Sequence, residues 1–187
     1  LSTRQTGHVA AVGLHLYTQM LSQAVQELKG RAPGEAAPPV SAANITIDLP
    51  LPAYLPTDYL PEMGLRLQLY RRVGGLTTLD EVDAMREELR DRFGPPPPAV
   101  NGLLYQMAVK ILAQQANAAA IIHLNGVIHI KLPYLAEVNR DRLQADLGGE
   151  ARVSRTAVML PLTGDWEPRL LDALRFLAAG VRQSAGW

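Results

Sequence analysis

Two short apolar runs separated by an Asn-Gly pair constrain the fold of this chain more than any other feature. The runs are 120–124 and 127–132, and Asn125-Gly126 lies between them. Asn and Gly tolerate the positive φ angles that a two-residue hairpin turn requires. Apolar residues alternate on both sides of the pair, which is typical of strands with one buried face. The sequence therefore predicts a β-hairpin over 120–132.

The strongest helical pattern lies at 79–93. At 100° per residue its apolar side chains fall within an arc of about 120°, which we interpret as the face toward the core. Thr77 or Thr78 is the expected N-cap, and Gly94 followed by four prolines ends the helix. The residues of this arc that we expect in the core are Leu79, Val82, Met85, Leu89 and Phe93.

The other elements follow from the spacing of apolar residues, which repeats about every 2 residues in strands and every 3.6 residues in helices. Further helices are expected at about 61–73, 99–116, 135–147 and 166–181, and further strands at about 45–49, 151–154 and 156–161. Strands and helices in this order predict an α+β fold, with a small, mainly antiparallel sheet packed with several helices.

A stretch rich in Pro, Ala and Gly, residues 30–43, divides the chain. Such a composition cannot build a core, so we interpret it as a flexible linker. Before it, residues 1–29 predict a separate helix from about Ala10, and residues 44–187 form the main domain. The first residue is Leu rather than Met, so we expect the chain to begin inside a longer protein.

Composition excludes several classes of function. The formal net charge is zero, with 18 basic and 18 acidic side chains, which argues against a dedicated nucleic-acid-binding protein. The absence of cysteine excludes a thiol nucleophile and a cysteine-ligated zinc site. No phosphate-binding loop, GxGxxG or GxSxG motif is present. We therefore expect no catalytic residues, and no apolar run is long enough to span a membrane.

Histidines and carboxylates give only weak signals of a metal or catalytic site. His123 and His129 flank the predicted turn and could lie across from one another, but no carboxylate accompanies them at useful spacing. We expect no metal. Asp165, Glu167 and Asp172 are interpreted as charges that cap and solvate the start of the last helix.

An acidic stripe is the most informative polar feature. Opposite the apolar arc of the 79–93 helix, the sequence predicts a solvent face that carries Asp80, Glu81, Glu87, Glu88 and Asp91. Two interpretations remain open, an ordinary solvated face or a docking surface for arginines of a partner. The preceding helix offers Arg66, Arg71 and Arg72, which either pair with neighbouring acids or contact phosphate.

Four segments resemble a known family. The runs ITIDLPLPAYLPTDYLP, LRLQLYRRV and ELRDRFGPPPPAV, in this order, resemble the C-terminal domain of bacterial transcription-repair coupling factors (Mfd), over about residues 45–187. Upstream, RQTGHVAAVGLHLYTQML, with Gln5, Gly7 and His8, is similar to the end of the RecG-like translocation motif that precedes that domain. The chain departs from the family at Leu1-Ser2, where Leu-Gly is usual, and lacks the ATPase motifs.

The resemblance implies a non-catalytic, autoinhibitory domain. In the family, this domain packs on an N-terminal UvrB-like module and masks its UvrA-binding surface, through acidic residues that fall here on Glu88 and Asp91, with Glu81 and Glu87 as further candidates. It implies no cofactor in this chain, with ATP and Mg in the motor domains of the parent. UvrA, RNA polymerase and double-stranded DNA are indirect partners, the location is the bacterial cytoplasm, and the chain is expected to be a monomer. The alternative is a DNA-contacting accessory domain that uses the three arginines.

Overall fold

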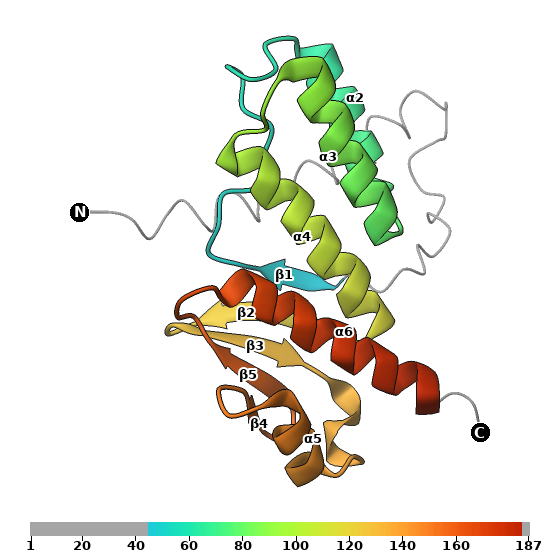
Figure 1. Ribbon diagram of the computed structural model, residues 1–187, viewed down its shortest axis with the longest axis vertical. Helices are drawn as coiled ribbons and strands as arrows, with labels where there is room; N and C mark the ends of the chain where they lie inside the picture. The colour runs from blue at the N-terminus through green and yellow to red at the C-terminus, as the bar shows by residue number, and fades with distance from the viewer. Residues whose placement is uncertain (1–44, 185–187) are drawn as a thin grey trace, which may run out of the picture.

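The computed structural model describes residues 45–184 (Figure 1). The predicted helix within 1–29, with Gln5, Gly7 and His8, and the predicted linker 30–43 lie outside the described residues. The described elements are β1 (Thr46–Asp48), α2 (Met63–Gly74), α3 (Leu79–Phe93), α4 (Pro98–Gln115), β2 (Ala120–Leu124), β3 (Val127–Lys131), the 3-10 helix η1 (Pro133–Ala136), α5 (Arg140–Leu147), β4 (Arg152–Val153), β5 (Ala157–Pro161) and α6 (Trp166–Ser184).

A five-stranded sheet in the order β1-β2-β3-β5-β4 forms one layer. Strand β1 pairs with β2 in parallel, and every other pairing is antiparallel. The predicted hairpin is confirmed: Leu124 pairs with Val127, and Asn125 and Gly126 have φ angles of 50° and 75°. Both values lie in the left-handed region that two-residue hairpin turns use. The expected α+β fold with a mainly antiparallel sheet is therefore confirmed.

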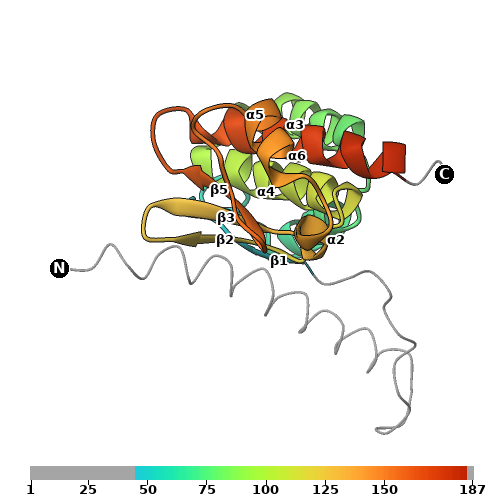
Figure 2. The same ribbon diagram turned by 90° about the horizontal axis from the view of Figure 1, so that it is seen from below.

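Helices α4 and α6 cover one face of this sheet (Figure 2). Helix α4 is apolar on nearly all sides because it packs against α6, the sheet and α3 at once. Helix α4 also lies directly against the extended segment that follows β1. A Cβ placed on Gly102 would lie only 1.9 Å from the carbonyl oxygen of Pro52. Glycine at this position therefore lets the helix and the proline-rich segment touch.

Helices α2 and α3 form an antiparallel pair that packs on α4 beyond the β1 edge of the sheet (Figure 1). Helix α3 begins at a capping box, in which Thr78 and Glu81 each accept from the backbone of the other. Val82, Met85 and Leu89 are buried as predicted. Leu79 and Phe93 are only half-buried, because they lie at the two ends of the helix, where the core is open on one side.

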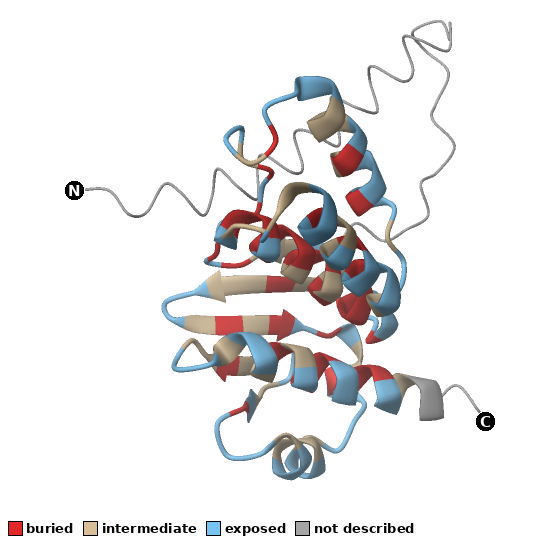
Figure 3. Cartoon of the chain, turned by 45° about the horizontal axis from the view of Figure 1, so that its top comes forward, coloured by how far each residue is buried: buried red, intermediate tan, exposed pale blue. Residues whose placement is uncertain are grey.

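Two predicted helix boundaries were wrong. Helix α2 begins at Met63, with Glu62 as its N-cap, so Pro61 precedes the helix instead of opening it. The single helix expected at 135–147 is divided into η1 and α5, because the side chain of Asn139 caps a new helix and accepts from the Arg142 amide at 3.0 Å. Helix α5 buries none of its side chains, and its surface is exposed or partly exposed (Figure 3).

Candidate docking surface on helix α3

The six carboxylates of α3 are divided among three different environments. Glu81 serves the helix itself, since its Oε2 accepts from the amides of Thr77 at 2.7 Å and Thr78 at 3.1 Å. These bonds lower the pKa of the Glu81 carboxyl, with the Thr77 amide as the largest cause. A carboxylate that satisfies two free amides at a helix start is a capping group. Its engagement leaves Glu81 less available to a partner than its neighbours.

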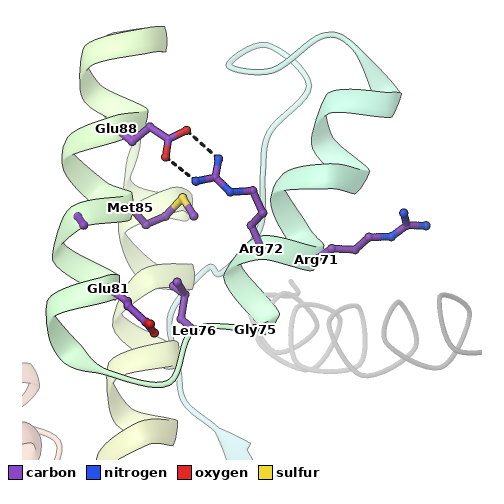
Figure 4. Close-up of a pocket in the computed structure, with 8 residues that line it drawn as sticks. Arg71, Arg72, Gly75, Leu76, Glu81, Met85 and Glu88 are labelled. Carbon is purple, nitrogen blue, oxygen red and sulfur yellow. Dashed lines mark hydrogen bonds and ion pairs between the residues drawn. The ribbon is translucent and has the colours of Figure 1, made fainter.

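Glu88 faces α2 and is only partly exposed to solvent. Its two carboxylate oxygens accept from the two Nη atoms of Arg72 at 2.7 and 2.5 Å, and Oε1 also accepts from Arg92 at 2.8 Å (Figure 4). The paired guanidinium of Arg72, followed by that of Arg92, lowers the pKa of Glu88 to about 2. The prediction that Glu88 lies opposite the apolar arc was therefore wrong. At 100° per residue it lies about 120° from the centre of that arc, on the flank that α2 covers.

A hollow of about 390 Å³ lies beside this ion pair, between α2 and α3. Met85 and Leu76 form part of its wall, and Arg72 and Glu88 point toward one another across it (Figure 4). Arg71, which directly precedes Arg72 on α2, points away from α3 (Figure 4). The hollow is therefore a seam between two helices closed by one bidentate ion pair, the strongest geometry for a guanidinium and a carboxylate.

The exposed acidic stripe runs along Asp83, Glu87 and Asp91, each one turn after the last. Their side chains are 71%, 52% and 76% exposed. Asp83 was missed by the sequence analysis, although its spacing of four residues from Glu87 could have placed it on the same face. Asp80, at the first turn, is also exposed.

Arginines of α3 lie against this stripe. Arg86 pairs with Asp83 at 2.5 Å, and Arg90 pairs with Glu87 and lies 3.9 Å from the Oδ1 atom of Asp91. Exposed pairs of this kind contribute only about 0.2–1 kcal/mol, so a partner can displace them at little cost. Asp91 has the longest ion-pair distance of the three acids and the greatest exposure. It is therefore the carboxylate of the stripe most accessible to an incoming arginine.

The three arginines of α2 do not form a common basic surface. Arg66 donates to the carbonyl oxygens of Leu60 at 2.5 Å and Pro61 at 2.8 Å, which ties the chain before α2 to its first turn. Arg72 is held by Glu88, as the pairing interpretation predicts. Arg71 alone points outward (Figure 4). Because each of the three has a different neighbour, the structure does not bring them together as a phosphate-binding group.

The two hairpin histidines lie on opposite faces of the sheet. His129 pairs with Ile122, whereas His123 pairs with Ile128, because the two-residue turn joins 124 to 127. The expectation that they could lie across from one another was therefore wrong. Among residues 45–184 no group of three potential metal ligands occurs.

Comparison with known proteins gives the family of this chain. The TRCF domain family model matches residues 49–143, which include α2, α3 and the acidic stripe. The chain belongs to the TRCF domain family. This TRCF domain is 30% identical over 98% of its length to a transcription-repair-coupling factor of Staphylococcus aureus (strain USA300), of which it spans 16%. It is 33% identical over 76% of its length to that of Haemophilus influenzae, of which it spans 12%.

A solved structure shares the fold of this TRCF domain. The crystal structure of the C-terminal domain of a transcription-repair coupling factor superposes with a TM-score of 0.64 at 18% identity, over 76% of this chain and 96% of that one. The order of elements predicted from the sequence and the family resemblance are thus both confirmed. None of the helices within the described part of the chain has the length and apolarity needed to cross a membrane.

Proposed function

We propose that this TRCF domain is a non-catalytic docking domain that restrains its parent, a transcription-repair coupling factor, in a resting state. Its partner would be the N-terminal UvrB-like module of the same protein, whose UvrA-binding surface it would mask. The observation that supports the proposal most directly is the exposed stripe of Asp83, Glu87 and Asp91 on a capped helix. Three carboxylates at one-turn spacing suit arginines of a facing surface.

The rigidity of α3 makes the stripe a defined surface. The capping box at Thr78 holds its first turn, and the ion pair from Arg72 to Glu88 ties its middle to α2. Its buried side then packs on α4, so the exposed side keeps one orientation. A pre-positioned surface loses less conformational entropy on docking than a flexible one. This is a general advantage for an intramolecular contact that must form and release.

The chemistry of the contact favours reversibility. An arginine of the partner that reaches Asp91 or Glu87 would replace Arg90, so that one exposed charge pair is exchanged for another. The gain then comes from the stronger attraction between two partly desolvated charges, reduced by the cost of removing water from them, and stays modest. Glu88, which is paired with both Arg72 and Arg92, would add little negative potential to this surface. A clamp of this strength can be opened when partners elsewhere on the parent favour the open state.

The test uses the full-length parent with the change Asp91→Lys. We expect binding of the isolated N-terminal module to the chain of residues 1–187 to fall. UvrA binding by the full-length parent should rise by about tenfold, the effect of about 1.4 kcal/mol. A matched control is Asp172→Lys on α6, since the side chain of Asp172 is 73% exposed, close to the 76% of Asp91, and among the described residues pairs only with Arg175 of its own helix. If both variants bind UvrA as the parent does, the stripe is only a solvated face.

A further inference from the structure

The sheet has a second face that none of the described helices covers. Helices α4 and α6 lie on one side (Figure 2), and along β3 buried residues alternate with residues that are at least partly exposed. On the covered side Ile121, Ile128 and Ile130 are fully buried. The residues that alternate with these and with their neighbours form the open face. They are Thr46 and Asp48, Ala120, Ile122 and Leu124, Val127, His129 and Lys131, Ala157, Met159 and Pro161, and Arg152.

The register places one row of this open face across all five strands. Asp48 pairs with Ile122, Ile122 with His129, His129 with Met159, and Met159 with Arg152. The row therefore carries a carboxylate on one edge strand and a guanidinium on the other, with apolar side chains between. His129 lies in the centre, on the middle strand β3. Neither Asp48 nor Arg152 belongs to an ion pair among the described residues.

We infer that this open face associates with the same face of a second copy of the chain, about a two-fold axis that runs along β3. Rotation about that axis exchanges the two edges of the sheet while keeping each row in place. Asp48 of each copy then meets Arg152 of the other, Ile122 meets Met159, and His129 lies on the axis. A two-fold axis across the strands would instead set Asp48 against Asp48 and Arg152 against Arg152. The charges therefore select the axis along β3.

The size of the face sets the strength of this dimer. Strands spaced about 4.8 Å apart and rising about 3.4 Å per residue, with 20 residues in the five strands, give roughly 330 Å² per copy. A total of about 650 Å² lies below the area of stable interfaces, and contacts of this size are weak. Lys131 also lies on β3 and meets its own copy, which costs further affinity although its long side chain can turn aside. We therefore expect a dissociation constant well above that of a permanent dimer.

The experiment is sedimentation of the whole chain, residues 1–187, at concentrations from about 10 μM to a few mM. The parent should shift toward dimer across this range. Asp48→Arg or Arg152→Asp alone should weaken the dimer about tenfold or more, because each places like charges together at two places in every dimer. The double variant should restore it, because both pairs re-form with the charges exchanged. Asp172→Arg on α6 is the matched control and should leave the dimer unchanged.

Lys131→Ala gives an independent measurement. With the axis along β3, Lys131 of one copy faces Lys131 of the other. The substitution removes this like-charge contact, so it should tighten the dimer several-fold. A chain that stays monomeric at the highest concentration overturns the inference. So does a dimer that is insensitive to both single reversals, or a folded double variant that remains monomeric. A folded Lys131→Ala variant that dimerises no better than the parent would show that the axis does not run along β3.

Discussion

Glu88→Gln tests whether the ion pair between α2 and α3 stabilises the folded domain. The pKa of Glu88 is lowered from 4.5 to about 2, first by Arg72 and then by Arg92. That difference would correspond to at most about 3 kcal/mol. Because the side chain is 31% exposed, solvent screens the pair, and we discount the contribution to about 1 kcal/mol. Glutamine keeps the shape and removes the charge, so the variant should be about 1 kcal/mol less stable at pH 7.

The pH dependence of that loss distinguishes the ion pair from simple packing. A carboxyl with a lowered pKa stabilises the fold above its unfolded value near 4.5, and this contribution is lost as the pH falls through about 2. The free energies of unfolding of the parent and of Glu88→Gln should therefore converge between pH 4.5 and 2. Urea unfolding at several pH values, followed by circular dichroism, measures both.

A matched variant and a clear contrary result complete this test. Glu87→Gln alters a 52% exposed carboxylate paired only along its own helix, and should change the free energy of unfolding by less than about 0.5 kcal/mol at every pH. If the difference between the parent and Glu88→Gln stays constant down to pH 2, the charge is not the cause. If Glu88→Gln is as neutral as Glu87→Gln at pH 7, the geometry of the pair contributes nothing measurable.

Three further changes probe the fold by thermal or urea unfolding. Phe93→Ala should cost about 1–2 kcal/mol, less than the 3–5 of a fully buried ring, because Phe93 is half-buried; a loss near 4 would place the ring in the core. Gly102→Ala should cost at least about 2 kcal/mol, since its Cβ would meet the Pro52 carbonyl at 1.9 Å, and a neutral result would exclude that approach. Thr78→Ala should cost about 1 kcal/mol through loss of the capping box with Glu81, and an unchanged midpoint would argue against it.

The sequence by itself determined the elements whose causes are local. The hairpin depends on the Asn125-Gly126 pair, and α3 depends on Thr78 at its start and Gly94 at its end, so neighbouring residues suffice to predict both. The family resemblance likewise rests on short motifs that can be read along the chain. The predicted start of α2 was wrong because Pro61 suits both the first turn of a helix and the extended segment before it.

Only the tertiary structure decided which partner each polar side chain meets. Glu88 and Asp91 are three residues apart on one helix, but α2 covers the flank of Glu88 and leaves Asp91 exposed. The order of the strands, and with it the placement of Asp48 and Arg152 on opposite edges of one face, depends on pairing between distant segments. Periodicity shows which side of an element is polar. It does not show what faces that side, because packing of elements distant in sequence determines the neighbour.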